Sequence, residues 1–480
     1  MAYRNLGEYL AELERRGELR RVKVEVDPVL EMAEVAARLV RRGGPAVLFE
    51  KARGSPYPVA MNLFGTPSRV RLALGDDPDE IGRRLASWLD LPRLESWGDR
   101  MRALPRLAQV ASFFPRRVTR APCQEVVEES PSLEKLPVLQ CWPGDGGRFL
   151  TLPLVITRDP VSGKTNVGMY RMQVHDDRTL GMHWHVHKDG ARHARALSPG
   201  ERLPVAVALG GDPATIYAAT APLPAGLDEF LFAGFLRQAP VELVRAVTVD
   251  LEVPAEAEFV LEGYVEVGEE RVEGPFGDHT GYYSPPEPYP VFHLTALTRR
   301  CNPVYPATVV GPPPMEDAWL GKATERIFMP LLRLLVPDLV DLDLPVEGVF
   351  HNLAIVSIRK RYPGHARQVM SALWGLGLLA LTKVVVVVDE DVDVHDYRQV
   401  TWVVGTSVDP GRDVTVVWGP VDALDHAAPY PAYGTKMGID ATRKWPGEGQ
   451  VRPWPARAEM SPEIRELVDR RWEEYGLGSR

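Results

Sequence analysis

The sequence has 480 residues, of which 45% are hydrophobic and 25% are charged, with a formal net charge of −9. A chain of this length exceeds one compact core, so two or three domains are expected. The acidic balance argues against a general nucleic-acid binder, which would present a basic surface. The cysteines Cys123, Cys141 and Cys301 lie far apart. Their spacing excludes a disulfide framework or a cysteine-ligated zinc site and fits a reducing compartment.

The apolar segments predict neither a secretory signal nor a transmembrane segment. Residues 1–21 have no apolar core of the kind a signal peptide contains. The most apolar run, 372–388, is shorter than the roughly 20 residues that a membrane span needs and contains Lys383. We therefore expect a cytoplasmic protein.

Residues 1–120 mix helical and extended patterns. An amphipathic helix is expected over 6–19, and short strands are expected over 45–52 and 57–65. The first part of the chain is therefore predicted to be an α+β domain.

Residues 121–308 carry mostly β signals. The runs 149–159, 165–176 and 179–189 predict three consecutive strands separated by turns. One helix is expected over 227–237. A closed or half-closed antiparallel barrel would protect the edges of so many strands.

From residue 309 onward, helical and extended patterns alternate. The strand 383–391 contains five consecutive valines, which indicates burial on both faces of a parallel α/β sheet. The acidic segment 389–396 is expected to be a solvated loop that caps the next helix. A terminal amphipathic helix over 461–476 has a face that can dock either on a neighbouring molecule or on its own chain.

Histidines cluster in the run 182–189. His183, His185 and His187 alternate, which would place them on one face of a strand. Neutral imidazole suits zinc, manganese or iron, but a polar outer face of a barrel explains the pattern equally well. The following residues read as a strand-to-helix junction, with Asp189 as N-cap and Lys188 available to a phosphate.

Asn166 and Arg171 share the expected strand 165–176. An arginine fork suits a carboxylate or a phosphate. Strand parity puts these two residues on opposite faces, so a common site requires a bend near Gly168.

The stretch "EGPFGDHTGYYS", residues 273–284, holds two carboxylates, Glu273 and Asp278. Glycines and Pro275 separate them, and such residues alone favour a simple surface turn. The alternative is a rigid loop that carries acid–base chemistry.

Several motifs together resemble the UbiD family of decarboxylases. They are "DGGRF" at 145–149, "NVGMYR" at 166–171, "MHWHVHKDGA" at 182–191, "EGPFGDHTGYY" at 273–283 and "GTKMGIDATRKWPGE" at 434–448. The resemblance implies an N-terminal α+β domain over 1–120 and a central split β-barrel that binds prenylated FMN over 121–308. It also implies a C-terminal α/β domain over 309–480 that serves in oligomerisation.

The resemblance also implies a set of site residues. A divalent metal, Mn²⁺ in most relatives, would be bound by Asn166, His187 and Glu229, and K⁺ is a further candidate ion. The implied cofactor contacts are these metal ligands together with Met169, Tyr170, Arg171, His183, Trp184, His185, Lys188 and Asp189. Relatives often have Arg and Leu where this chain has His183 and His185.

The implied catalytic residues are Arg171, Glu273 and Asp278. Arg171 would hold the substrate carboxylate, and Glu273 or Asp278 would deliver a proton after CO2 has left. Crowding of two carboxylates is expected to raise the pKa of one, while Arg171 lowers the pKa of the other.

The resulting expectation is a non-oxidative, reversible decarboxylase of an aromatic or α,β-unsaturated acid, most simply a polyprenyl 4-hydroxybenzoate type of quinone precursor. A flavin prenyltransferase would supply its cofactor, and the chain would form a dimer or hexamer. A prenylated substrate would bring it to a membrane surface without an anchor. Two alternatives are a flavin-free metal-dependent hydrolase that uses His183, His185 and His187, and a non-catalytic flavin-binding assembly subunit.

Overall fold

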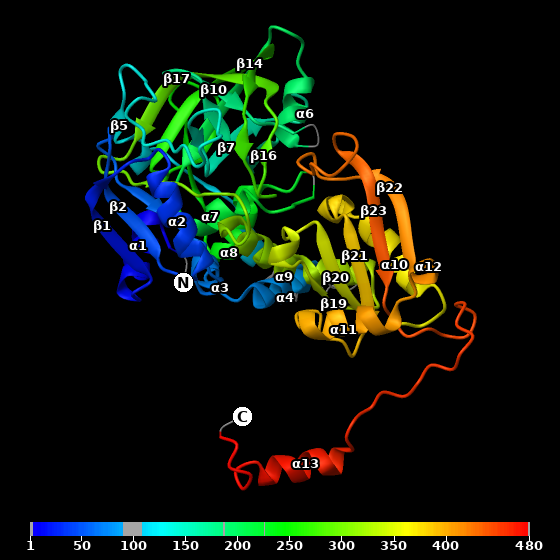
Figure 1. Cartoon of the computed structure of the whole chain (residues 1–480). Coiled ribbons are helices and arrows are strands. Elements are labelled where there is room, and N and C mark those ends of the chain that lie inside the picture. The colour runs from blue at the N-terminus through cyan, green and yellow to red at the C-terminus, as the bar shows by residue number, and fades with distance from the viewer. Residues whose placement is uncertain (1–2, 90–107, 186–187, 225, 479–480) are drawn as a thin grey trace.

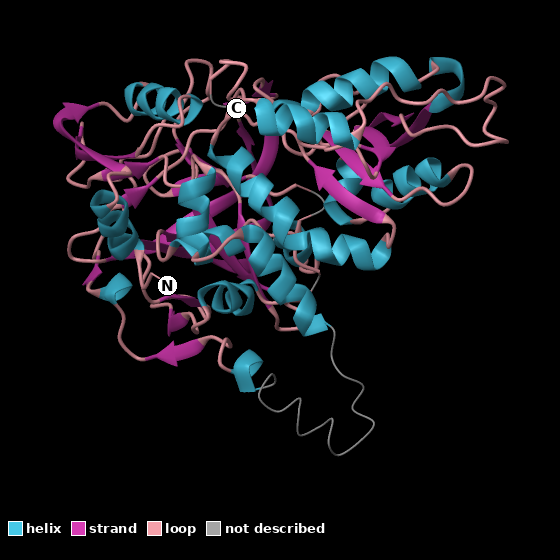
Figure 2. Cartoon of the chain, turned by 90° about the horizontal axis from the view of Figure 1, so that it is seen from below, coloured by secondary structure: helices cyan, strands magenta, loops and turns pink. Residues whose placement is uncertain are grey.

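The computed structural model describes residues 3–89, 108–185, 188–224 and 226–478. The N-terminal and central strands lie in one part of the molecule and the C-terminal sheet lies in another (Figure 1). Helices run between these two parts when the molecule is viewed from below (Figure 2). The chain is therefore a mixed α/β protein with several sheets.

The N-terminal sheet is completed by a strand from a distant segment. Its order is β1-β2-β3-β18. Its strands are β1 (Leu19–Val26), β2 (Ala46–Ala52), β3 (Val59–Met61) and β18 (Tyr305–Pro306), and its helices are α1 (Leu6–Arg15), α2 (Glu31–Arg41), α3 (Pro67–Leu74) and α4 (Pro78–Leu89). The side chain of Asn5 caps α1 by accepting from the Glu8 N–H. The sheet thus becomes complete only after the chain has crossed the central region.

The central sheet has nine strands, eight of which follow one open path. Its order is β6-β9-β10-β17-β14-β11-β7-β8, and β5 pairs with β17. The strands are β5 (Val126–Val127), β6 (Phe149–Leu150), β7 (Pro153–Arg158), β8 (Thr165–Met169), β9 (Met172–Val174), β10 (Thr179–Met182), β11 (Arg202–Leu209), β14 (Phe259–Glu273) and β17 (Glu287–Arg299). The end strands β6 and β8 do not pair with each other within the described residues, so no closed barrel forms there. The split barrel remains a prediction.

Smaller elements surround this sheet. They are the strands β4 (Arg116–Val118), β12 (Glu242–Arg245), β13 (Glu252–Pro254), β15 (Phe276–Gly277) and β16 (Tyr283–Ser284), the helices α6 (Asp189–Arg195), α7 (Pro213–Ala218) and α8 (Glu229–Arg237), and the 3-10 helix η1 (Pro122–Gln124). The helix expected over 227–237 is confirmed as α8. Asp228 is its N-cap and accepts from the backbone N–H groups of Phe230 and Leu231.

A bulge shapes the long β14–β17 pair. The register shifts between Glu262 and Gly263. A Cβ at Gly263 would lie 1.8 Å from the carbonyl oxygen of His293, so only glycine allows this approach. Beyond the bulge and a second register shift, β14 ends at Glu273, which lies opposite Glu287 of β17.

The C-terminal sheet has the order β19-β20-β21-β23-β22, and β20, β21 and β23 are parallel. Its strands are β19 (Leu339–Asp343), β20 (Leu353–Ile358), β21 (Val384–Asp389), β22 (Val414–Pro420) and β23 (Tyr433–Asp440). The helices are α9 (Glu316–Leu335), α10 (His365–Trp374), α11 (Tyr397–Ser407) and α12 (Pro410–Asp413), with the 3-10 helices η2 (Val346–Gly348) and η3 (Gly377–Leu381). Alternate valines of β21 enter two different hydrophobic clusters, which confirms burial on both faces.

The last helix lies apart from the rest of the molecule. α13 (Pro462–Arg471) follows an extended segment and buries none of its residues (Figure 1). Within the described part of the chain, α13 therefore lies apart from the body of the molecule (Figure 1). No helix in the described part of the chain is both long and apolar enough to span a membrane.

Candidate active site

Arg171 lies between two carboxylates at the junction of β8 and β9. Its Nε and Nη2 donate to the two oxygens of Glu273 at 2.8 and 3.0 Å, and its Nη1 donates to Asp278. All three residues are largely buried, and the Glu273 side chain is completely enclosed. Arg171 therefore contacts both of the acids with which the family resemblance grouped it.

The strand is interrupted between β8 and β9, and Arg171 lies at this interruption. The expected continuous strand over 165–176 is wrong, because β8 pairs with β7 whereas β9 pairs with β6 and β10. The bend falls at residues 170–171, close to the position expected near Gly168. A Cβ at Gly168 would lie 2.3 Å from the ring of Tyr170, so this glycine makes room for that ring.

Side chains from other segments hold the backbone of the loop that carries Glu273 and Asp278. The Gly274 N–H donates to Gln173 Oε1 at 2.7 Å, and the Gly277 N–H donates to Asp145 Oδ1 at 2.8 Å. The other Asp145 oxygen accepts from the N–H groups of Cys141 and Trp142. Asp145 and Gln173 are thus positioning residues for Glu273 and Asp278.

Sequence reasoning assigned no role to Asp145 or Gln173. The motif "DGGRF" offered one usable signal, a charged residue directly before two glycines. A Cβ at Gly146 would lie 2.1 Å from the carbonyl oxygen of Gly274, so this segment must approach the loop backbone closely.

Both acids are ionised in this arrangement. Burial alone would raise the pKa of Glu273, but hydrogen bonds from His183 and Arg171 outweigh it and lower that pKa to about 2. Burial likewise opposes ionisation of Asp278, yet His279 and Arg171 hold its pKa far below the usual range. The expectation that crowding raises one of the two pKa values is wrong here, because Arg171 lies between the carboxylates.

His183 and His185 do not lie on a strand. β10 ends at Met182 and α6 begins at Asp189, so the strand expected over 179–189 is wrong at residues 183–185 and 189. His183 Nδ1 lies 3.0 Å from Glu273 Oε2, and its Nε2 lies 2.7 Å from His185 Nε2. Burial lowers the pKa of His183 and lowers that of His185 to about 4. His187 lies outside the described residues.

Asn166 and Glu229 fit a divalent cation. Glu229 Oε2 accepts from the N–H of Val167, the neighbour of Asn166, at 3.0 Å. Asn166 Nδ2 is buried and finds no hydrogen-bond partner within the described structure. Burial raises the pKa of Glu229 to about 7. A carboxylate and an amide each offer an oxygen ligand of the kind that Mn²⁺ and Mg²⁺ prefer.

The remaining predicted cofactor contacts lie around the start of α6. Tyr170 and Trp184 are buried, and Met169 is half-buried. Lys188 is exposed and precedes α6 as its N-cap, so the prediction of Asp189 as N-cap is wrong. Asp189 instead begins the helix and forms an ion pair with Arg192 at 2.9 Å.

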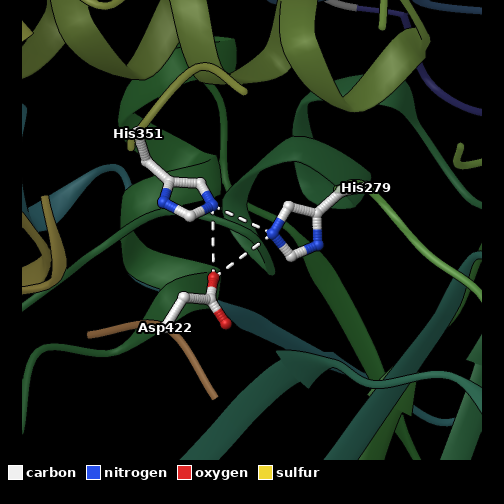
Figure 3. Close-up of side chains that lie close together, drawn as sticks. All are labelled: His279, His351 and Asp422. Carbon is white, nitrogen blue, oxygen red and sulfur yellow. Dashed lines mark hydrogen bonds and ion pairs between the residues drawn. The ribbon is translucent and has the colours of Figure 1, made fainter. Parts of the chain in front are cut away.

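A second cluster adjoins Asp278 and was not predicted. His279 Nδ1 lies 2.9 Å from Asp278 Oδ1, and its Nε2 lies 2.9 Å from His351 Nε2 and 3.2 Å from Asp422 Oδ2 (Figure 3). Burial opposes protonation of His279, but the hydrogen bonds to Asp278 and Asp422 raise its pKa to about 10. No sequence spacing links His351 and Asp422 to the loop, so only the folded chain reveals this cluster.

Three family models match this chain in order. They describe the N-terminal, Rift-related and C-terminal domains of 3-octaprenyl-4-hydroxybenzoate carboxy-lyase and match residues 10–89, 116–313 and 318–441. An uncharacterised protein from Archaeoglobus fulgidus is 58% identical over 478 residues, which cover 99% of each chain.

Solved structures extend the similarity. The vanillic acid decarboxylase of Sedimentibacter hydroxybenzoicus is 30% identical; its closed form matches with a TM-score of 0.86 over 100% of each chain, and its open form with 0.79 over 99% of each. The UbiD-class enzyme HmfF from Pelotomaculum thermopropionicum, in complex with FMN, is 33% identical with a TM-score of 0.79, over 97% of this chain and 99% of that chain. An evolved dimeric form of HmfF, in complex with prFMN, is 32% identical with a TM-score of 0.78, over 98% of this chain and 100% of that chain.

Proposed function

Because the chain belongs to the UbiD family of carboxy-lyases, we propose that it removes CO2 from an aromatic or α,β-unsaturated carboxylic acid, reversibly and without oxidation, with prenylated FMN as cofactor. The observation that carries the proposal is the buried guanidinium of Arg171, which donates hydrogen bonds to Glu273 and Asp278. The similarity to a vanillic acid decarboxylase and to HmfF with FMN or prFMN supports it.

Arg171 and Glu273 provide the acid–base part of this reaction. A substrate carboxylate competes for the Arg171 guanidinium and adds a negative charge beside Glu273. Both effects raise the pKa of Glu273 from its low value in the unliganded site, so that it can take up a proton. After CO2 leaves, Glu273 or Asp278 returns a proton to the substrate carbon.

The proposed cofactor and metal sites use residues of β8, α8 and the segment that leads into α6. Prenylated FMN would supply the electron sink that side chains lack. We assign the divalent metal, Mn²⁺ by preference, to Asn166, His187 and Glu229, with K⁺ as a further ion. Met169, Tyr170, Arg171, His183, Trp184, His185, Lys188 and Asp189 complete the proposed cofactor contacts.

The proposed substrate class is a polyprenyl 4-hydroxybenzoate type of quinone precursor. The proposal also includes a flavin prenyltransferase as cofactor supplier and a homo-oligomer built through the domain 309–480. The hydrolase alternative is disfavoured because His183 bonds Glu273 and His185 rather than facing an open site. A non-catalytic flavin-binding subunit would have no need for the enclosed Arg171–Glu273 ion pair, whose burial costs desolvation free energy.

The test is to express the chain together with a flavin prenyltransferase and analyse released small molecules and metals by mass spectrometry. We expect to find prenylated flavin and manganese. We also expect CO2 release from a panel of prenylated hydroxybenzoate, vanillic acid and cinnamic acid. Preference within the panel assigns the substrate class. Metal without flavin, together with hydrolytic activity that survives Arg171→Ala, would overturn the proposal.

A further inference from the structure

His279, His351 and Asp422 come from three separate segments that meet where the central region faces the C-terminal sheet. His279 lies in the loop between β15 and β16, His351 precedes β20, and Asp422 follows β22. Their side chains converge on one point (Figure 3). All three are largely buried, with side-chain exposures of 15%, 23% and 14% respectively.

The distances among the three converging atoms match a metal coordination site. Nε2 of His279 and Nε2 of His351 are 2.9 Å apart, and each lies 3.2 Å from Asp422 Oδ2. Ligands that bind a metal at about 2.1 Å lie about 3.0 Å apart when they meet at right angles and about 3.4 Å apart at the tetrahedral angle, so the observed separations need only small adjustments of the side chains. Two histidines and one carboxylate on one face of a metal leave further coordination positions open.

The outer contacts orient these atoms as they do in metal sites. Asp278 Oδ1 faces His279 Nδ1 at 2.9 Å, which directs the other ring nitrogen toward the cluster. Asp422 Oδ1 accepts from the Leu424 N–H at 2.8 Å, which leaves Oδ2 for the cluster.

We propose that His279, His351 and Asp422 bind a divalent transition-metal ion of the zinc class, at a site separate from the cation site at Asn166 and Glu229. Imidazole nitrogen together with one carboxylate suits Zn²⁺, Co²⁺ or Fe²⁺ better than Mg²⁺ or Ca²⁺. The proposal rests on these three residues and is independent of the flavin.

Such an ion would join the catalytic loop to the C-terminal domain. Asp278 is adjacent to His279 and contacts Arg171, whereas His351 and Asp422 flank strands of the C-terminal sheet. The chain is also more similar to the closed than to the open form of the Sedimentibacter decarboxylase. The metal would therefore stabilise this closed arrangement and hold Asp278 beside Arg171.

The experiment is a calorimetric titration of the full-length, metal-stripped, flavin-free chain with Zn²⁺, followed by cobalt(II) absorption spectroscopy on the same samples. Asp422→Asn and His351→Ala remove one ligand each, and Asp422→Asn keeps the side-chain shape. His426→Ala is the matched control, since His426 is an exposed histidine four residues from Asp422 that lies outside the cluster. Asn166→Ala removes the other proposed cation site.

Wild type, His426→Ala and Asn166→Ala are expected to bind one equivalent of Zn²⁺ that both ligand variants lose. Loss of a direct ligand should weaken binding by more than about 100-fold, the upper end of the cost of losing an outer contact. Zinc bound equally by wild type and both ligand variants, or no zinc bound by wild type, would overturn the proposal. Failure of the decarboxylase assignment would leave this result unchanged, because flavin and substrate are absent.

Discussion

Glu273 is the single residue whose chemistry is most sharply defined by its contacts. Arg171 and His183 both bond its carboxylate, and the side chain is fully enclosed. Glu273→Gln keeps the size of the side chain but cannot ionise or deliver a proton. CO2 release should fall by about 10²- to 10⁴-fold while the flavin content per chain stays the same. Steady-state turnover and flavin absorbance on the same sample measure both quantities.

The control for this variant is Glu287→Gln. Glu287 lies opposite Glu273 in the β14–β17 ladder but is exposed. Its turnover should remain close to that of wild type. If Glu273→Gln also turns over at the wild-type rate, Glu273 does not deliver the proton, and Asp278 becomes the candidate acid.

His395 gives a pH-dependent prediction away from the active site. Its Nδ1 lies 3.0 Å from Asp343 Oδ1 and its Nε2 lies 3.2 Å from Asp341 Oδ2. These hydrogen bonds raise the pKa of His395 to about 10. A raised pKa in the folded state stabilises the protein fully below pH 6.5, the unfolded value, and this stabilisation is lost as the pH rises through about 10.

His395→Ala should therefore lower the thermal unfolding midpoint at pH 6 but hardly change it above pH 10. The side chain is 43% exposed, so solvent screening keeps the effect below about 1 kcal/mol. Differential scanning calorimetry of both proteins across this range measures the difference. A difference that stays constant from pH 6 to pH 10 would contradict the proposed imidazolium.

At the scale of helices and strands, α4 and α9 illustrate how one glycine sets a helix packing distance. A Cβ at Gly82 would lie 2.8 and 2.9 Å from the backbone oxygens of Arg326 and Ile327 in α9. Backbone atoms cannot move aside as a side chain does, so Gly82→Ala should destabilise the fold by about 1–3 kcal/mol. Chemical denaturation followed by circular dichroism measures this change.

Gly405→Ala provides the matched comparison for Gly82→Ala. Gly405 is also helical, in α11, but nothing lies within 4 Å of its added Cβ. This variant should be neutral or more stable by up to about 1 kcal/mol, because alanine favours helix. Equal destabilisation by both substitutions would show that helix propensity, rather than contact with α9, controls the effect.

Elements with strong local signals were predictable from the sequence. The valine run became the buried strand β21, the helix expected over 227–237 is α8, and Asp396 of the acidic segment caps α11. The strand breaks after Met169 and Met182 were not predictable, because the sequence pattern stays extended there and the neighbouring strands decide where pairing stops.

At the scale of the whole molecule, the site depends on contacts between distant segments. Arg171 and Glu273 are 102 residues apart in sequence, and only the family resemblance suggested their meeting. Asp145, Gln173, His351 and Asp422 were not assigned, because hydrogen-bond acceptors for a loop backbone and contacts between domains follow no sequence spacing. The positioning residues and the second cluster can therefore be recognised only from the tertiary structure.

The last helix, α13, lies apart from the other elements that the structure describes (Figure 1). α13 buries no residue, although Ile464 and Leu467 add apolar side chains that are 46% and 38% exposed. Their spacing, continued by Val468, forms an apolar stripe along one helix face. An exposed apolar stripe of this kind is expected to be covered by a second molecule in a homo-oligomer.

A chain that ends at Ala458 tests this expectation and keeps the contact of Arg457 with the Trp402 ring at 4.8 Å. Light scattering coupled to size-exclusion chromatography should show a smaller oligomer than for the full chain. Circular dichroism should show an unchanged folded core, because α13 buries none of its residues. An unchanged oligomer would show that the C-terminal sheet or another surface makes the interface, and that the apolar stripe of α13 has a different partner.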